Sequence, residues 1–166
     1  MSLNYDDLAP IYDELYGPEQ RRKLAVVASL ILGAKSVLDA GCGTGLLAEY
    51  LDAQVYHVCL DSSKEMLRHY LHRRRYGDGV VADMSMPPLR CCFDSVVAVT
   101  SLHECPRAFP RLVDLTRRGG LVVITLKERL PEPPLNDPRI SLAEIIKERD
   151  EKILVFTRYD GGEEPR

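Results

Sequence analysis

The sequence predicts an α/β domain with a doubly wound, mostly parallel sheet of the Rossmann-like kind. Three observations predict it: short β-branched stretches alternate with segments of helical spacing, acidic residues end several predicted strands, and glycines occupy every second position of 41–45. Strands separated by helices pair in parallel and are covered on both faces. The 166 residues, 45% of them hydrophobic, fit one domain over 1–166.

In the first half of the chain, helical segments precede and separate three predicted strands. Leu24, Val27 and Ile31 recur at helical spacing before Gly33, which predicts a helix over 19–32. The strands expected here are 36–40, 55–60 and 79–82, and the connecting helices begin near Leu46 and cover 63–74.

The second half continues the alternation as far as the C-terminus. The strands expected here are 93–100, 120–126 and 153–159, and the helices are 106–116 and 141–149. Residues 128–138 hold several prolines and predict an extended loop rather than a domain linker. We expect 1–18 to be a lid-like N-terminal segment and 160–166 a flexible tail.

Charge and composition exclude some classes of partner. The net charge of −3, from 22 basic and 25 acidic residues, gives no general attraction to nucleic acid or to an anionic membrane. The basic run at 69–75 closes a predicted helix, where the helix dipole favours cations, so a solvated helix end explains it better than RNA binding. No apolar run is long enough to span a membrane and 1–10 do not resemble a signal peptide, so we expect a cytoplasmic protein.

The cysteines give no sign of a disulfide framework or a metal site. Cys42, Cys59, Cys91, Cys92 and Cys105 show neither a CxxC pair nor a zinc-like spacing with histidine. We expect buried free thiols and no metal. An intracellular disulfide is expected only if the source is a hyperthermophile.

The stretch VLDAGCGTG at 37–45 places Gly41, Gly43 and Gly45 in a turn between a strand and a helix. Glycine lets the backbone adopt positive φ and lets a ligand approach the main chain, so the stretch predicts a small-molecule cradle; a tight turn without a ligand is the alternative. Leu46 occupies the position where a dinucleotide-binding fingerprint has Gly or Ala, and Asp39 precedes the turn. Dinucleotide binding is therefore disfavoured.

Acidic residues end the second and third predicted strands, at the edge where ligands of such folds bind. Asp61 can accept both hydroxyls of a ribose, or it can cap the following helix together with Ser62. Asp83 can accept from an adenine amino group while Met84 covers the ring. With Asp39, three acids at successive strand ends predict one ligand crevice.

Over residues 5–126 the sequence resembles the class I S-adenosylmethionine-dependent methyltransferases. Motifs similar to those of the family occur in the family's order, which makes the resemblance specific. They are VLDAGCGTG at 37–45, LDSSKEML at 60–67, VVADMSMPPL at 80–89, FDSVVAVTSLHEC at 93–105 and RRGGLVVIT at 117–125. The lead-in YDDLAPIYDELY at 5–16 is similar to that of small-molecule methyltransferases of quinone synthesis, in the type 11 group.

The resemblance implies S-adenosylmethionine as the cofactor and assigns its nucleoside contacts. Asp61, with Ser62 beside it, would take the ribose hydroxyls, and Asp83 with Met84 would bind the adenine. Met66 would cover the ribose and adenine, with packing in the core as the alternative.

At the methionine end the resemblance implies the glycine-rich turn, the acid before it and the end of the fourth strand. Two tyrosines near the N-terminus would close over the cofactor, with helix packing as the alternative. The residues implied are Asp39, Gly41, Cys42, Gly43, Gly45, Thr100, Ser101, Tyr5 and Tyr12.

His103 is the candidate catalytic base. Methyl transfer from a sulfonium requires position, desolvation and sometimes proton removal, and imidazole titrates near neutrality. His103 follows the fourth strand, near the expected methyl group, although a structural role is the alternative. Glu104 and Arg107 are expected to be solvated.

The sequence predicts methyl transfer to an oxygen, nitrogen or carbon of a small molecule. Residues 100–106 read TSLHECP, without the Asn/Asp-Pro-Pro-Tyr signature of the family's amide and adenine methyltransferases, and no insertion is large enough for a substrate domain. The alternatives are methylation of RNA or protein with a partner subunit, and a cofactor-binding module with little catalysis. We expect a monomer or homodimer.

The C-terminal part is expected to be shortened. Members of the family finish with a helix and two further strands, whereas only 153–159 is predicted as a strand after the fifth. Either one strand is missing, or 130–138 holds an irregular one.

Overall fold

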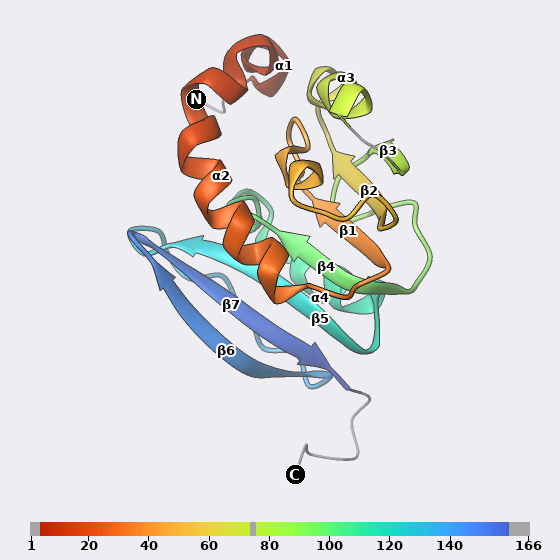
Figure 1. The fold of residues 1–166 in the computed structure, drawn as a ribbon. Coiled ribbons are helices and arrows are strands. Elements are labelled where there is room, and N and C mark those ends of the chain that lie inside the picture. Colours follow the sequence, from red (N-terminus) through yellow and green to blue (C-terminus); the bar gives the residue numbers. More distant parts are fainter. Residues whose placement is uncertain (1–3, 74–75, 160–166) are drawn as a thin grey trace.

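The computed structural model describes residues 4–73 and 76–159, and its centre is a seven-stranded sheet (Figure 1). The strands are β1 Ser36–Ala40, β2 Tyr56–Asp61, β3 Gly77–Val81, β4 Phe93–Ala98, β5 Thr116–Lys127, β6 Ile140–Glu148 and β7 Glu151–Arg158. Their order is β3-β2-β1-β4-β5-β7-β6. β1 to β5 pair in parallel and β7 is antiparallel to both of its neighbours, which confirms the predicted doubly wound, mostly parallel fold.

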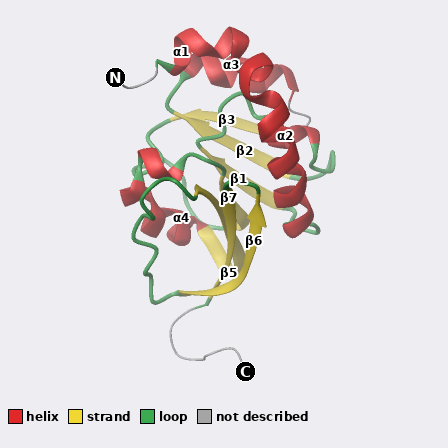
Figure 2. Ribbon diagram, turned by 90° about the vertical axis from the view of Figure 1, so that its left-hand side faces the viewer, coloured by secondary structure: helices red, strands yellow, loops and turns green. Residues whose placement is uncertain are grey.

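Helices cover both faces of this sheet, and Figure 2 shows α2 on one face and α4 on the other. The helices are α1 Tyr5–Leu8, α2 Tyr12–Leu30, α3 Lys64–Arg73 and α4 Phe109–Leu115. Single 3₁₀ turns cover Ala9–Ile11, Leu46–Glu49, Leu102–Glu104 and Pro106–Ala108. In the described part of the chain, no helix is long and apolar enough to cross a membrane.

α2 begins at Tyr12, well before the start predicted at residue 19. The first turns contain Gly17 and Pro18, which are unfavourable in helices, so the sequence does not predict a helix there. Glycine has a low helix propensity, and proline has no N–H to donate to a helical hydrogen bond. The first turns are held from outside instead. Asp13 accepts hydrogen bonds from the Thr44 hydroxyl and from the Arg73 guanidinium. Tertiary contacts therefore determine where this helix starts.

The helix predicted from Leu46 is wrong: the segment forms only the 3₁₀ turn Leu46–Glu49. Leu46 and Leu47 are both buried within that turn, while Glu49 and Tyr50 are exposed. The apolar side chains are thus covered after one turn, and the chain crosses to β2 without a further helix.

The helix predicted over 141–149 is also wrong, because this segment is strand β6. A register shift between Leu142 and Glu144 interrupts the alternation of side chains that would have marked a strand. β6 pairs with β7 through a two-residue turn, in which Arg149 has a φ of 57°. Backbone pairing in a hairpin therefore overrides the helical spacing of the apolar residues.

The C-terminal part consequently has both of the family's final strands. The expectation that a strand is missing or that 130–138 holds one is wrong, since that stretch has no strand in the structure. Within the described residues, this part is shortened because it lacks a helix between β5 and β6. The predicted tail at 160–166 lies outside the described residues, as do Arg74 and Arg75 of the predicted basic run.

Alternating side chains of the strands form two apolar layers, one on each face of the sheet. On one face Val37, Val97 and Val123 pack with α2. On the other face Leu38, Val96 and Ile124 pack with α4 and with the C-terminal hairpin. Helix α4 and the hairpin contribute to this second layer the side chains of Phe109, Leu112, Val113, Leu154 and Phe156.

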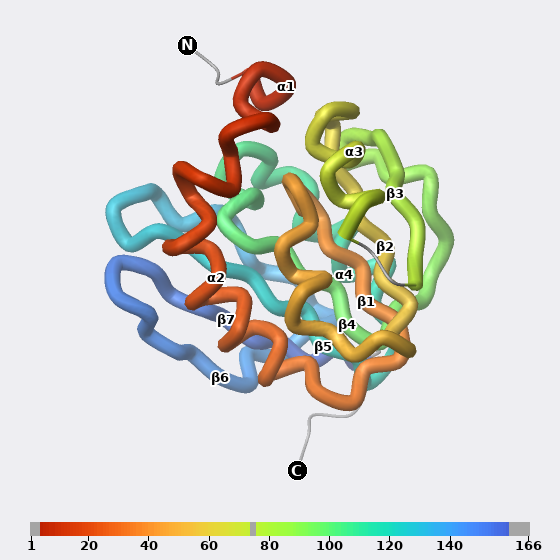
Figure 3. Tube along the Cα trace, turned by 45° about the horizontal axis from the view of Figure 1, so that its top comes forward, coloured from red at the N-terminus to blue at the C-terminus, as the bar shows by residue number. Residues whose placement is uncertain are grey.

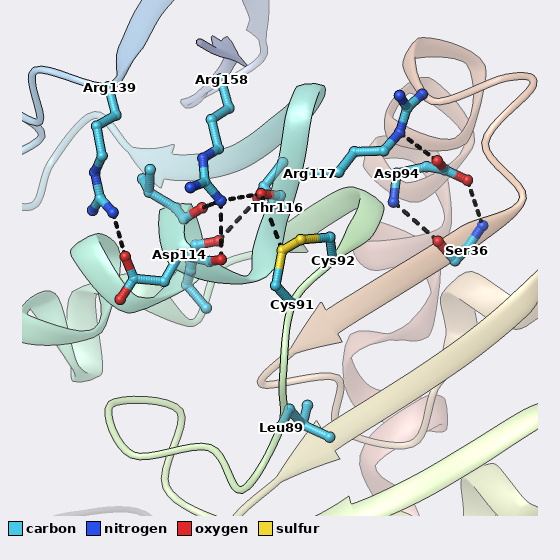
Figure 4. The surroundings of a disulfide bond; sticks show 12 residues. Ser36, Leu89, Cys91, Cys92, Asp94, Asp114, Thr116, Arg117, Arg139 and Arg158 are labelled. Atoms are coloured by element: carbon cyan, nitrogen blue, oxygen red, sulfur yellow. Dashed lines mark hydrogen bonds and ion pairs between the residues drawn. A yellow bond between two sulfur atoms is a disulfide. The ribbon is translucent and has the colours of Figure 1, made fainter. Parts of the chain in front are cut away.

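Arg158 fastens the C-terminal hairpin to α4 (Figure 4). Its guanidinium donates to the carbonyls of Val113 and Asp114, both at 3.0 Å, and to that of Thr116. Carbonyls at the end of a helix have no donor within the helix, and the helix dipole favours a cation there. Arg139, before β6, adds an ion pair with Asp114.

The expectation of free thiols is wrong for four of the five cysteines. Cys42 of the glycine-rich turn is bonded to Cys59 of β2, with a Cα–Cα distance of 5.5 Å that lies within the range of disulfides. Cys91 is bonded to its neighbour Cys92 (Figure 4), and Cys105 is a free thiol. Nothing in the local sequence indicates the first pair, because it is the pairing of β1 with β2 that brings the two residues together.

A buried ion pair joins the first long helix to the last strand. Lys23 of α2 and Glu151 of β7 are 2% and 3% exposed, and Lys23 Nζ lies 2.6 Å from Glu151 Oε1. The same ammonium donates to Thr100 Oγ1 at 2.7 Å, and Glu19 lies 3.6 Å away. A buried charge of this kind is stable only while its partners are present.

Replacing Lys23 alone is expected to destabilise the fold strongly. In Lys23→Met, Glu151 stays buried without its cation, which should lower the free energy of unfolding by about 3–5 kcal/mol. The double variant Lys23→Met/Glu151→Gln should recover part of this loss. Urea unfolding measures both, with Arg68→Met of an exposed pair as a control expected to change stability by less than about 1 kcal/mol. A loss as small for Lys23→Met would contradict this account.

Candidate functional site

A cavity of about 600 Å³ opens at the carboxyl ends of β1, β2, β3 and β4. Ligands of open α/β sheets bind at this edge, because the turns after parallel strands meet there. Each strand contributes the residues directly after it, and the N-terminal segment adds two tyrosines. The lining residues include Tyr5, Tyr12, Gly41, Gly43, Asp61, Ser62, Met66, Asp83, Met84, Thr100, Ser101 and Glu104.

The glycine-rich turn presents bare backbone to this cavity. Gly41, Gly43 and Gly45 have φ values of 71°, 56° and 74°, which side-chain-bearing residues rarely adopt. A Cβ at Gly41 would lie 2.4 Å from Ser101 Cβ and 2.8 Å from Met84 Cε. Only glycine therefore fits at the point where the turn meets the other walls.

Asp61 caps the helix after β2, and its role toward a ribose stays a prediction. Its Oδ1 accepts the Ser63 N–H and its Oδ2 accepts the Gly43 N–H, each at 2.8 Å, so it fixes the turn after β1 as well as the start of α3. Each carboxylate oxygen has a second lone pair that can accept a ligand hydroxyl. Burial raises the pKa of Asp61, although the two N–H groups act in the opposite direction.

Asp83 is held in its charged form. The N–H and hydroxyl of Ser85 both donate to its Oδ1 at 2.7 Å, and Arg107 donates to its Oδ2 at 3.1 Å. These hydrogen bonds, from Ser85 first and then Arg107, lower the pKa of Asp83 to about 2. Next to this carboxylate, Met84 lines the cavity, so an acceptor and an apolar surface lie side by side.

Thr100 has an unusual backbone conformation on the cavity wall. Its φ is 55°, which is rare for a β-branched residue and costs about 1–3 kcal/mol. Its N–H donates to Thr125 Oγ1 at 2.7 Å, and its hydroxyl oxygen accepts from Lys23. The buried ion pair therefore supports the conformation of a residue that lines the site. Ser101 is held next to it by donation to the Ala40 carbonyl at 2.8 Å.

The N-terminal segment forms one wall of the cavity. The Tyr5 hydroxyl donates to Glu104, and the Ser63 hydroxyl at the start of α3 donates to Asp6. Figure 3 shows α1 and α3 side by side in this arrangement. Tyr12 also lines the cavity, and burial, followed by the charge of Asp61, raises its pKa to about 12. Both tyrosines thus lie at the cavity as predicted, rather than packing only between helices.

Three predicted cofactor residues do not line the main cavity. Asp39 and Cys42 face a second space of about 30 Å³ behind the turn, which shares Gly41, Gly43 and Tyr12 with the main one. Asp39 Oδ2 also lies 3.7 Å from Nε2 of the buried His57. Gly45 reaches neither space, and a Cβ on it would meet the Tyr70 ring at 2.4 Å. A glycine is therefore required at position 45 for packing against Tyr70.

His103 does not line the cavity, whereas Ser101 and Glu104 do. Its Nε2 lies 3.8 Å from Glu104 Oε1. Glu104 and Arg107 are exposed, as expected, and in addition both line the cavity, where Glu104 contacts Tyr5 and Arg107 contacts Asp83. Their position directly after β4 was the available signal, because residues after a parallel strand lie at the ligand edge.

Comparisons with known proteins agree with this geometry. The methyltransferase domain family matches residues 38–124. The chain is 32% identical over 148 residues to demethylmenaquinone methyltransferase of Thermobifida fusca, covering 80% of this chain and 63% of that protein. It is 39% identical over 107 residues to the 18S rRNA (guanine-N(7))-methyltransferase of Bos taurus, covering 54% and 38%. The chain thus spans less than two thirds of either relative.

Solved structures share the fold at lower identity. The CcbJ methyltransferase from Streptomyces caelestis superposes with a TM-score of 0.73 at 17% identity, covering 94% of this chain and 98% of that one. The magnesium protoporphyrin IX methyltransferase from Synechocystis, with bound S-adenosylmethionine, gives 0.65 at 17%, covering 95% and 86%. Since the family match contains the glycine-rich turn and the acidic strand ends, the chain belongs to the class I methyltransferases, which use S-adenosylmethionine.

Proposed function

We propose that this chain catalyses methyl transfer from S-adenosylmethionine to a small-molecule acceptor. The observation that carries the proposal is the single cavity in which the bare backbone at Gly41, the Asp61 carboxylate and the Asp83 carboxylate meet. A backbone cradle with carboxylates on neighbouring strand ends is suited to a nucleoside bearing a polar tail.

The residues present fit this cofactor. Asp61 keeps lone pairs for two ribose hydroxyls, Asp83 is a charged acceptor for an amino group, and Met66 and Met84 supply apolar cover. The Gly41 backbone would receive the methionine part without obstruction from a side chain. When bound, S-adenosylmethionine supplies an electrophilic methyl group. The protein then needs to position the acceptor, exclude water and receive any proton that leaves.

The acceptor is proposed to lie between the N-terminal segment and the residues after β4. Tyr5, Tyr12, Thr100 and Glu104 surround this part of the cavity. His103 remains a candidate for proton removal, since its Nε2 lies 3.8 Å from Oε1 of Glu104, which lines the cavity.

Titration calorimetry tests the cofactor directly. The chain should bind S-adenosylmethionine and S-adenosylhomocysteine with micromolar or better affinity and should not bind NADH. A screen with methyl-labelled cofactor against small metabolites should then show transfer by the isolated chain. If neither sulfur compound binds, the proposal is wrong.

A second hypothesis is that the chain is a cofactor-binding module that needs a partner, or a methyltransferase of RNA or protein. Both relatives named above extend well beyond the part that this chain matches. The two hypotheses differ in one measurement. Labelled transfer that appears only with an added partner fraction or with RNA supports the second hypothesis, and transfer to a small acceptor by the chain alone supports the first.

The Asp61→Ala variant is expected to bind S-adenosylhomocysteine more weakly. Loss of hydrogen bonds between a charged carboxylate and the ribose hydroxyls should cost roughly 1.5–3 kcal/mol of binding free energy, measured by calorimetry. Asp52→Ala removes an exposed acid in the segment before β2 and should leave affinity unchanged. Unchanged affinity in a folded Asp61→Ala protein would assign this residue to capping alone.

Gly41→Ala should impair cofactor binding more than its effect on folding explains. The new methyl group would meet Ser101 and Met84, so we expect the dissociation constant to rise at least tenfold, in line with about 1.4 kcal/mol per decade. Gly33→Ala is the matched control, because Gly33 has a φ of 91° with no neighbour within 4 Å of an added Cβ. Equal affinities for the two variants would show that the contact at Gly41 does not shape the site.

A further inference from the structure

The charged groups on the cavity wall leave one carboxylate without a role in holding the cofactor. Asp61, Asp83 and Glu104 line the cavity together with one cation, Arg107. Arg107 already donates to Asp83 and to Ser85 at 3.1 Å. With Asp61 and Asp83 assigned to the nucleoside, Glu104 is the carboxylate that faces the acceptor part.

Glu104 is placed by a short turn anchored in the core. Leu102 is fully buried, and the 3₁₀ turn Leu102–Glu104 is closed by donation from the Glu104 N–H to the Ser101 carbonyl at 3.1 Å. The Glu104 side chain is 48% exposed and accepts the Tyr5 hydroxyl through Oε1. Among the described residues, no donor is bonded to its Oε2. That oxygen can accept a hydrogen bond from a ligand.

Two hydroxyls of the cavity wall, those of Tyr5 and Ser101, already donate to acceptors of the protein. Burial and the hydrogen bond to Glu104 raise the pKa of Tyr5, so its hydroxyl stays protonated and its hydrogen is directed to Glu104. The Ser101 hydroxyl donates to the Ala40 carbonyl. A ligand group that carries hydrogens and no negative charge is therefore favoured here, and a carboxylate or phosphate would face like charge.

We propose that the acceptor is an amine, bound by its N–H groups to Glu104, and that Glu104 receives the proton that the nitrogen loses. This inference rests on the proposed function. The bound ammonium first gives one proton to the Glu104 carboxylate. The nitrogen lone pair freed in this way forms the bond to the methyl carbon, and the carbon–sulfur bond breaks with its electron pair remaining on sulfur. The product leaves as a methylated ammonium, and Glu104 passes its proton to water.

Charge favours an amine over a hydroxyl acceptor. A hydroxyl becomes a good nucleophile by losing its proton, and the resulting anion would lie next to the Glu104 carboxylate. An amine attacks while neutral and becomes positive, which this carboxylate stabilises.

Binding to the protein saturated with S-adenosylhomocysteine tests the charge preference without turnover. The probes are benzylamine, benzyl alcohol and benzoate, which share a ring and differ in the polar group, together with propylamine. We expect an amine to bind at least tenfold more tightly than the alcohol or benzoate, and Glu104→Gln to remove that preference. Glu144→Gln, an exposed residue of β6, makes the same charge change away from the cavity and should have no effect.

Transfer of a labelled methyl group to the amine that binds best gives the second readout. Glu104→Gln should lower turnover by about 10²–10⁴-fold with unchanged affinity for S-adenosylhomocysteine, and Glu104→Asp should retain part of it. Benzoate binding as tight as the amine, binding of no amine, or full turnover in Glu104→Gln would each overturn the inference. Retained binding of S-adenosylhomocysteine in those cases would leave the proposed function standing.

Discussion

The ion pair between Lys23 and Glu151 connects the parts of the chain that the sheet alone does not join. The two residues are 128 positions apart, one on the helix before β1 and the other at the start of the final strand. Their contact with Thr100 extends the connection to the cavity wall. Separating the two residues would leave each charge buried without its partner, which costs free energy. The ion pair therefore fixes α2, the C-terminal hairpin and the end of β4 relative to one another.

The site follows from the direction of the strands. Parallel pairing of β1 to β5 brings the ends of four strands to one edge, and each end contributes one or two polar groups. Asp61 and Asp83 are then shaped by their immediate surroundings. Burial raises the pKa of Asp61, while hydrogen bonds from Ser85 and Arg107 lower that of Asp83. Two acids in equivalent positions therefore offer a ligand different electrostatic environments.

The strands of the sheet centre and the acids at their ends could be predicted from the sequence, because buried parallel strands are short apolar runs with clear boundaries. β6 could not, since it lies at the sheet edge with a register shift and acquires its structure by pairing with β7. The start of α2 could not be predicted either, because it is defined by the hydrogen bonds that Thr44 and Arg73 donate to Asp13.

Within the site, sequence reasoning found the residues whose chemistry is tied to a motif and missed those placed by long-range contacts. Glu104 is placed by the turn after β4 and held by its hydrogen bond with Tyr5, 99 positions away, so its position after the strand is the only local signal for its place in the wall. His103 has the more suggestive side chain, yet the turn directs its neighbour to the cavity. Asp39 lies behind the turn, because the side chain of a strand residue next to a bend need not follow the backbone to the front.

The glycine-rich turn is attached to β2 on several sides. The Cys42–Cys59 bond holds it covalently, the Gly43 N–H is held by Asp61, and the N–H groups of Gly41 and Cys42 both donate to the Leu60 carbonyl. A flexible glycine segment would lose conformational entropy on binding a ligand, at the expense of affinity. Here the ordering occurs when the chain folds. The turn is therefore already ordered before a ligand arrives, and a ligand that binds to it would lose little interaction energy in arranging it.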